Sequence, residues 1–200
     1  MISSSWLKVT ALLLGIIVTV AALGALYPKF EEQFIAMSVL GEYGTTDHYF
    51  PGNISLISVG DLVSWQLYVY NHMGELKDVS IRVKLLNSTM SGPNDENGTP
   101  SPVESFMEIP LVLASNETRI LPFYFRITQV TLVSDSVRIT EIEVVNRIFS
   151  VDVPARIGNS FRIVFELWSY EKESGSYIYS WRSAKGVYNV WNQIWFDITA

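Results

Sequence analysis

Apolar residues follow two main patterns along the chain: one continuous run near the N-terminus and a long series of alternating segments after it. The continuous run covers residues 9–27, VTALLLGIIVTVAALGALY, and contains no charged residue. A bilayer span takes about 20 predominantly apolar residues, so this run predicts one transmembrane helix. The chain is thereby divided into a cytoplasmic stub (1–8), the helix, a short stalk (28–34) and an extracytoplasmic domain (35–200).

After the stalk the apolar period is two, which is typical of strands with one buried and one wet face. Residues 62–70 bring Trp65, Leu67 and Val69 to one face, and residues 79–85 alternate Val, Ile and Leu with Ser, Arg and Lys. Short segments of this kind, separated by Gly, Pro and Ser turns, predict an all-β antiparallel sandwich or barrel. We expect strands at 62–70, 79–85, 106–114, 119–127, 136–146, 161–168, 176–182 and 190–199.

Two features predict that the domain lies outside the cytoplasm. Lys8 precedes the apolar run, whereas Lys29 is followed at once by Glu31 and Glu32, and positive charge favours the cytoplasmic side. The domain also carries four Asn-x-Ser/Thr triplets, which are acceptors for N-glycosylation. These predicted glycosylation sites are Asn53, Asn87, Asn97 and Asn116.

A cleaved signal peptide is the alternative interpretation of the N-terminus. The small residues of Ala22-Leu-Gly24 would then provide the cleavage site. The apolar run is longer than an ordinary signal core, which favours a retained helix. Both interpretations place the domain outside the cytoplasm.

The longest polar stretch, residues 90–104, reads MSGPNDENGTPSPVE. Three prolines and two glycines make it unsuitable for a core strand or helix. We expect this loop to be exposed and mobile, with Asn97 as the most accessible glycan acceptor.

Composition excludes several classes of function. Cysteine is absent, so disulfides, zinc–thiolate sites and thiol nucleophiles are all impossible. The net charge is −6 with 17% charged residues, and no run of Lys or Arg exists that would bind the phosphates of a nucleic acid. A domain of this length buries an adequate core without disulfides.

A search for catalytic or metal-binding patterns finds little. The chain has two histidines, His48 and His72; the second precedes a methionine, but the two lie in different predicted turns. We therefore expect Asn71-His72-Met73-Gly74 to be a hairpin turn with local hydrogen bonds, and we expect no metal and no cofactor. A carboxylate pair of Glu166 with Glu141 or Glu143 would suit a glycosidase, but nothing in the spacing selects it. No catalytic residue is identified.

Aromatic residues are enriched toward the C-terminus and have two interpretations. Aromatic rings stack on sugars and anchor protein interfaces, and they also fill cores. The candidate aromatic binding surface consists of Trp168, Tyr177, Tyr179 and Trp181.

Several motifs resemble one known group of proteins. They are Ser38-Val-Leu40-Gly41-Glu-Tyr-Gly44, Tyr49-Phe-Pro51, Val59-Gly60, Tyr70-Asn71-His72, Val79-Ser-Ile-Arg-Val83 and Trp191-Asn-Gln-Ile-Trp195-Phe. They look like the archaeal membrane-anchored proteins that carry the domain of unknown function 1616, although Phe50 separates Tyr49 from Pro51 and Met73 stands where an acidic residue is usual. The resemblance covers most of the chain after the apolar run. It implies an Ig-like β-sandwich on a membrane helix, and it implies no activity.

The sequence thus predicts a single-pass protein of the archaeal cell envelope, with a structural or protein-interaction role and no enzymatic activity. Its expected partners are the membrane and an envelope protein or glycan, not nucleic acid. Two alternatives stay open. In the first, the domain is a carbohydrate-binding module that uses the C-terminal aromatic residues. In the second, the chain is an accessory subunit of a membrane protein complex, and its helix packs on partner helices through small residues, namely Gly15, Thr19, Ala22 and Gly24.

Overall fold

The computed structural model describes residues 4–26, 32–156, 160–183 and 186–199, which belong to two compact units, Met1–Glu32 and Gln33–Ala200. The first unit contains helix α1 (Ser4–Leu26), so the predicted helical conformation of the apolar run is confirmed up to its last residue but one. Within the described ranges, no helix has the length and hydropathy needed to cross a membrane. Residues 28–31 of the predicted stalk lie outside the described residues.

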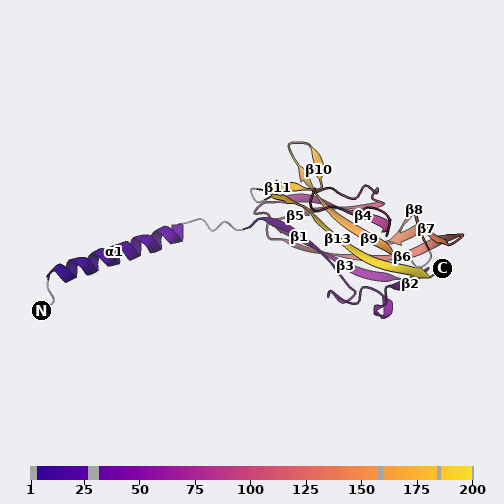
Figure 1. Ribbon diagram of the computed structural model, residues 1–200, viewed down its shortest axis with the longest axis horizontal. Helices are drawn as coiled ribbons and strands as arrows, with labels where there is room; N and C mark the ends of the chain where they lie inside the picture. Colours follow the sequence, from indigo (N-terminus) through magenta and orange to yellow (C-terminus); the bar gives the residue numbers. More distant parts are fainter. Residues whose placement is uncertain (1–3, 27–31, 157–159, 184–185, 200) are drawn as a thin grey trace. The chain divides into compact units, whose positions relative to one another are not determined.

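The second unit is a β-sandwich, which confirms the all-β, antiparallel part of the predicted fold (Figure 1). Its first sheet has five strands, and every neighbouring pair is antiparallel. Across the sheet the order is β1 (Phe34–Leu40), β3 (Val63–His72), β6 (Thr118–Val133), β7 (Ser136–Val144) and β8 (Arg147–Arg156).

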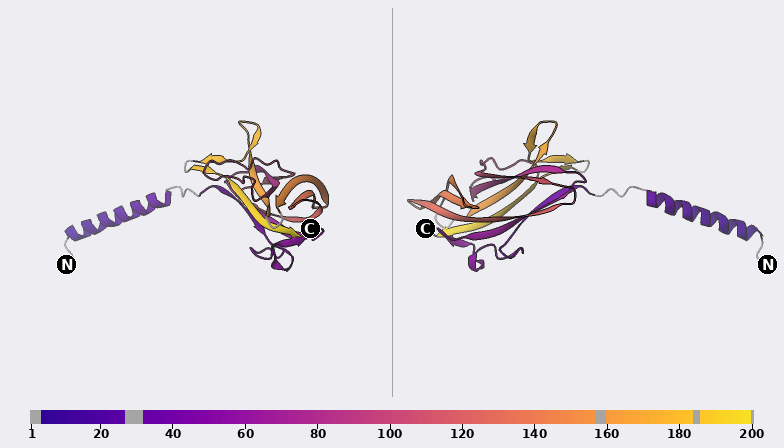
Figure 2. Two further views of the ribbon diagram at one scale, coloured as in Figure 1. Left: turned by 45° about the vertical axis from the view of Figure 1, so that its right-hand side comes forward. Right: turned by 180° about the vertical axis from the view of Figure 1, so that it is seen from behind.

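The second sheet has six strands, and its C-terminal strand lies inside it. Across the sheet the order is β2 (Leu56–Ser58), β13 (Val190–Thr199), β9 (Phe161–Glu171), β4 (Lys77–Asn87) and β5 (Met107–Leu113). The short β10 (Ser176–Ile178) extends β9 as a hairpin that projects from the sheet, as both views of Figure 2 show. A separate ribbon consists of β11 (Trp181–Ser183) and β12 (Gly186–Tyr188), and a 3-10 turn, η1, covers Pro51–Asn53. Only β2 and β13 pair in parallel among the described strands.

The core lies between the two sheets and is built by the predicted alternation. Trp65, Leu67 and Val69 are all fully buried, which confirms the strand phase predicted for residues 62–70. The Trp65 ring stacks on Phe123 with 6.1 Å between centroids, and its Nε1 donates a hydrogen bond to the Tyr49 carbonyl at 2.5 Å. The only polar atom of this side chain is therefore satisfied in an otherwise apolar environment.

The predicted strand assignments need correction. The single strand expected at 176–182 is divided, because β10 pairs with β9 and β11 pairs with β12. The sequence patterns predict no strand at β1, β2, β8 or β12. Pro154 in β8 argues against a central strand, but a proline is tolerated at a sheet edge, and β8 is such an edge.

The predicted hairpin turn at residues 71–74 is instead a crossing between the sheets, because β3 and β4 lie in different sheets. His72 is the last residue of β3 and not a turn residue. Asn71 is fully buried, and its Nδ2 donates to three carbonyls, those of Glu75, Leu113 and Ala114, at 2.8–3.0 Å. The predicted local hydrogen bonding is thus confirmed for Asn71. Its side chain joins the connection between β3 and β4 to the connection between β5 and β6.

Candidate functional site

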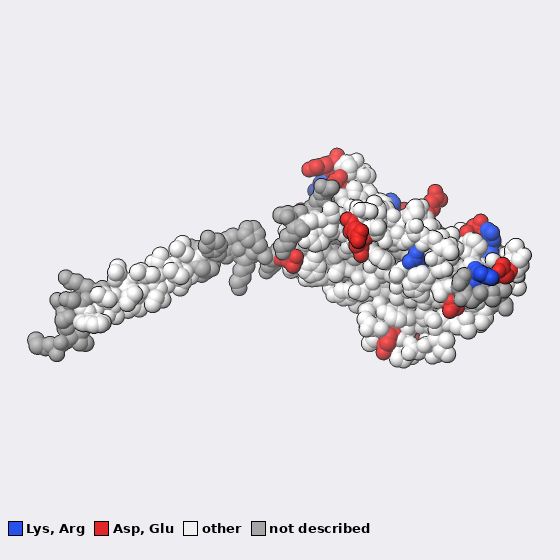
Figure 3. Space-filling model, in the orientation of Figure 1, with Lys and Arg blue, Asp and Glu red and all other residues white. Residues whose placement is uncertain are grey.

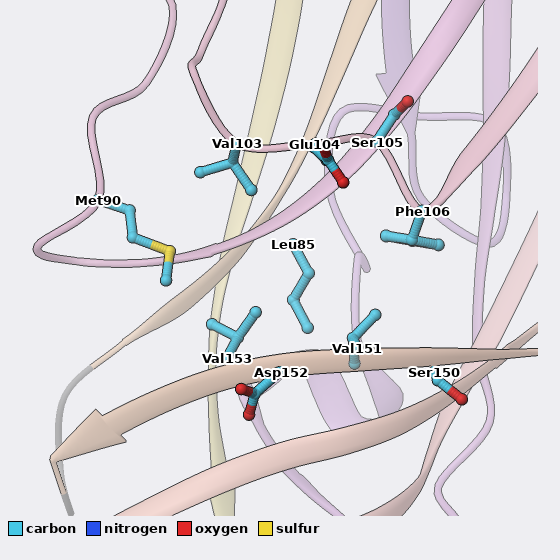
Figure 4. A pocket seen from close by; sticks show the side chains of 10 residues that line it. All are labelled: Leu85, Met90, Val103, Glu104, Ser105, Phe106, Ser150, Val151, Asp152 and Val153. Atoms are coloured by element: carbon cyan, nitrogen blue, oxygen red, sulfur yellow. The ribbon is translucent and has the colours of Figure 1, made fainter.

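A pocket of about 350 Å³ opens at the side of the sandwich where both sheets end in an edge strand. Residues 150–153 of β8 form one wall, and residues 103–106, which lead into β5, form the opposite wall. Leu85 and Met90 complete the lining, and Figure 4 shows the other side chains arranged around Leu85. The site therefore lies between the two sheets, at the side where their edge strands β8 and β5 are not paired with each other.

The pocket combines an apolar lining with acidic side chains. Phe106 meets Phe149 edge-on, with 5.5 Å between centroids, and so closes one end. Asp152 forms an ion pair with Arg138, whereas Glu104 has no ion-pair partner within the described residues. The apolar lining residues are Leu85, Met90, Val103, Phe106, Val151 and Val153. Such a site suits an apolar group that carries, or lies next to, a positive charge.

The loop over residues 90–104 is exposed in part, which confirms the prediction for residues such as Asn97, but it is bonded to the domain and is not a free excursion. Asn94 and Thr99 exchange two backbone hydrogen bonds, at 2.9 and 3.1 Å, which close the loop on itself. The Asp95 carboxylate accepts a hydrogen bond from Trp191 Nε1 at 2.6 Å. Contacts with the sheet thus override the disorder that the Pro- and Gly-rich composition predicts.

A buried ion pair holds the end of this loop in place. Lys84 and Glu166 are 2.8 Å apart, with side-chain exposures of 5% and 0%. Lys84 Nζ also donates to the Ser101 carbonyl, and Glu166 accepts hydrogen bonds from the Ser101 N–H and from Trp168 Nε1. Ser101 is therefore bonded through both backbone groups to one charge pair. We call residues 100–105, which this pair fixes, the strap.

The strap separates the pocket from a second hollow of about 360 Å³ on the outer face of the second sheet. Val103, Glu104 and Ser105 line both spaces. The second hollow is already filled in part, because the Arg82 guanidinium lies 3.7 Å from the centre of the Trp168 ring. A cation in that position covers one ring face, which a sugar would otherwise use for stacking.

The four residues of the candidate aromatic surface do not form one open platform. Tyr179 is buried and contributes no exposed ring face, so this part of the prediction is corrected. Burial raises the pKa of the Tyr179 hydroxyl. The Tyr177 hydroxyl donates to Asp78 at 2.7 Å, and this hydrogen bond, with burial, raises the pKa of Tyr177 to about 12. Trp168 and Trp181 are half-buried.

The four glycosylation triplets lie in different environments. Asn53, Asn97 and Asn116 are exposed. Asn87 is buried: its Nδ2 donates to the Pro154 carbonyl at 2.6 Å, and its Oδ1 accepts from the backbone N–H of Thr89. The folded domain therefore leaves no room for a glycan at Asn87, in contrast to the prediction from the triplet alone.

The remaining candidate residues do not assemble into a catalytic or metal site. His48 contacts Asp47 at 3.2 Å in the loop that follows β1, whereas His72, at the end of β3, contacts Asn116 at 2.7 Å. Among the described residues, no three His, Asp or Glu side chains are grouped to hold a metal ion. The considered carboxylates each have a different partner: Glu166 pairs with Lys84, Glu141 accepts a hydrogen bond from Thr128, and Glu143 pairs with Arg126. Acidic and basic side chains are interspersed on the face in Figure 3.

Sequence reasoning missed the pocket because its two walls come from segments with no distinctive pattern. Residues 103–106 were assigned to a loop and a strand start, and residues 150–153 to no element. The one available signal was the sequence Phe149-Ser-Val151-Asp-Val153, whose alternation is typical of a strand.

Neither a family model nor a curated protein matches the chain. Among solved structures, the chain is similar to the CARDB domain of the PF1109 protein from Pyrococcus furiosus, which was solved in complex with di-metal ions. The two chains are 12% identical with a TM-score of 0.39, and the match covers 85% of this chain and 91% of that one. It is also similar to the sporulation control protein Spo0M from Bacillus subtilis, with 10% identity, TM-score 0.37, and coverage of 83% and 49%. Similarity at this level says nothing about function, and the resemblance to the family with domain of unknown function 1616 stays a prediction.

Proposed function

We propose that the protein is a membrane-anchored interaction module, in which α1 holds an Ig-like sandwich at the outer side of a membrane. The observation that supports this most directly is the surface of α1. Its large apolar side chains are exposed, among them Leu12, Ile17 and Val20 at 63–67%. A continuous apolar surface of this kind is stable only when lipid or another protein covers it.

The composition of α1 supports lipid as that cover, because residues 9–26 contain no charge. At a rise of 1.5 Å per residue they extend about 27 Å, which is shorter than the roughly 30 Å of a bilayer's hydrocarbon core, and a membrane accommodates a short helix by local thinning. Lys8 precedes this stretch, which favours an N-terminus in the cytoplasm. The exposed side chains of Asn53, Asn97 and Asn116 support an outward-facing domain.

The sandwich supports an interaction role over an enzymatic one. The pocket between the edges is apolar with one unpaired carboxylate, and the buried carboxylate Glu166 is held by three hydrogen-bond donors in a structural contact. Neither arrangement presents an activated nucleophile or an acid–base pair. A binding surface that a membrane helix holds in place is the role that these features favour.

Membrane fractionation tests the anchor. We expect the full chain to stay in the pellet after alkaline carbonate extraction, and we expect protease added to intact cells to degrade the domain. A double variant, Leu14→Lys with Ile17→Lys, should move to the soluble fraction, because each buried charge costs about 2.5–3.5 kcal/mol at the centre of a span. The matched control, Ile120→Lys, adds a charge at an exposed position of β6 and should stay in the pellet. Carbonate-soluble wild-type protein would contradict the proposal.

A second candidate, an accessory subunit of a membrane complex, is favoured by one feature of α1. Gly15 has open space where a side chain would lie, and with Thr19 it lines a hollow along the helix. Small residues at this spacing let a second helix approach closely. Loss of a co-purifying membrane protein in Gly15→Leu, with Ala21→Leu as the control, would support this role.

A further inference from the structure

The pocket lies beside a strand that has an open hydrogen-bonding side. β8 is the last strand of the first sheet, and among the described strands it pairs with β7 alone. Residues 103–106 face it across the pocket, and no backbone hydrogen bond joins these two described segments. An extended segment that lies along β8 would find unused backbone groups on one side and the apolar pocket beside them.

The size of the pocket limits what it can receive. At about 350 Å³ it is at the lower end of the range for small-molecule sites, roughly 300–1,000 Å³. One wall is the strand β8 and the other is the irregular segment 103–106, and the space between them is open to solvent, so it is a slot and not a closed cavity. One or two apolar side chains of a bound segment match this volume better than a large cofactor does.

The rim of the pocket adds a charge preference. Glu104 is exposed and lacks an ion-pair partner within the described residues, whereas Asp152 on the opposite wall forms an ion pair with Arg138 at the surface. A bound segment with a lysine or arginine next to its apolar residue would supply the missing positive charge.

We propose that this pocket binds an extended segment of a partner protein, which pairs along β8, inserts an apolar side chain beside Leu85, and places a basic side chain at Glu104. This mode is known as strand addition, in which backbone hydrogen bonds supply affinity and side-chain pockets supply specificity. The inference rests on the proposed role as an interaction module and names the chemistry of its partner.

Pro154 limits how far a bound segment can pair along the edge strand β8. Pro154 has no N–H, and its carbonyl already accepts a hydrogen bond from Asn87. Pairing therefore ends before Pro154, and it involves the part of β8 that borders the pocket. A contact of this size belongs to the weak and transient class of interfaces.

Fluorescence anisotropy tests the site with the full chain in a non-ionic detergent. The probe is a labelled octapeptide of alternating lysine and valine, and the comparison peptide alternates glutamate and valine. We expect saturable binding of the lysine peptide and much weaker binding of the glutamate peptide. Val151→Asp should weaken binding about tenfold or more, because it places a carboxylate in the apolar slot. Ile120→Asp, on an exposed face of β6, should leave it unchanged.

A charge reversal at an exposed position keeps the test valid even if Val151→Asp unfolds. Glu104→Lys should invert the preference, so that the glutamate peptide binds better than the lysine peptide. Equal binding of both peptides by the wild type, or an unchanged preference in Glu104→Lys, would overturn the inference. So would self-association of the wild type that Val151→Asp abolishes, because the occupant would then be a second copy of this chain. Membrane fractionation is a separate readout, so a failure here leaves the proposed anchoring function standing.

Discussion

The buried ion pair between Lys84 and Glu166 provides a quantitative test of the fold. Lys84→Met would leave the Glu166 carboxylate buried without its counterion, and removing one partner of a buried pair costs about 3–5 kcal/mol. Glu166→Gln would strand the ammonium group of Lys84 in the same way and should cost a similar amount. Either variant should reduce the free energy of unfolding by a large fraction of the total for a domain of this size.

The double variant separates charge burial from hydrogen bonding. With Lys84→Met and Glu166→Gln combined, no charge is buried, and the glutamine carbonyl still accepts from the Ser101 N–H. The remaining cost comes from the Ser101 carbonyl, which loses its Lys84 donor, and from an imperfect hydrogen bond to Trp168; each such neutral group costs about 1–3 kcal/mol, less than an unpaired buried charge. We therefore expect the double variant to be more stable than either single variant.

Urea unfolding of the full chain in detergent, followed by tryptophan fluorescence, measures these differences. The control is Arg156→Met, which removes one partner of an ion pair whose side chains are 73% and 67% exposed. Exposed pairs contribute about 0–1 kcal/mol, so this variant should unfold nearly as the wild type does. Two results would refute the reasoning: losses below about 1 kcal/mol in both single variants, or single-variant losses that simply add in the double variant.

Three further predictions follow from individual side chains. Trp65→Ala should destabilise the domain by about 3–5 kcal/mol, because the ring is fully buried; an unchanged melting temperature would contradict its place in the core. In a host that N-glycosylates, glycopeptide mapping should find glycan at Asn97 and none at Asn87, and the reverse would be inconsistent with the hydrogen bonds of Asn87. The pKa of Tyr177 is raised to about 12, so its neutral form stabilises the fold fully below the usual tyrosine pKa of about 10, and this contribution is lost as the pH rises from 10 to 12. Absorbance titration at alkaline pH should show late-titrating tyrosines, among them Tyr177 and Tyr179, and Tyr177→Phe should remove one of them.

The strands with clean alternation were the predictable part of the fold. Residues 62–70 have one buried face, so their period of two reports directly on burial. In residues 79–85 the apolar face is buried as predicted, but Ser80 and Lys84 on the opposite face are buried as well. In β9, residues on both faces are likewise buried from Phe161 to Leu167. Charged positions such as Glu166 are ordinarily on the wet face of a strand, but here the strap covers that face. A local sequence pattern predicts neither the order of the strands in a sheet nor the covering of this face of β9 by the strap.

The conformation of the loop over residues 90–104 and the presence of the pocket could not be predicted from the sequence, because both depend on contacts between distant segments. Residues 90–104 have the composition of an exposed loop, yet Ser101 within them is 3% exposed because a distant ion pair binds its backbone. The pocket depends on two edges that meet only after all of the strands are placed. Local composition predicts how a segment behaves alone, and here long-range contacts decide otherwise.

The interior position of β13 has a consequence for how the protein is made. This strand lies between β2 and β9, and Asn192 within it bonds to the Met37 carbonyl, 155 residues earlier in the sequence. The second sheet therefore has a gap until residues 190–199 have been synthesised, long after α1 is complete. Pairings between such distant segments form slowly, since the intervening chain must first be ordered. If the domain is exported, it must cross the membrane before it folds, with the edges of β2 and β9 open to chaperones, to proteases and to pairing with other chains.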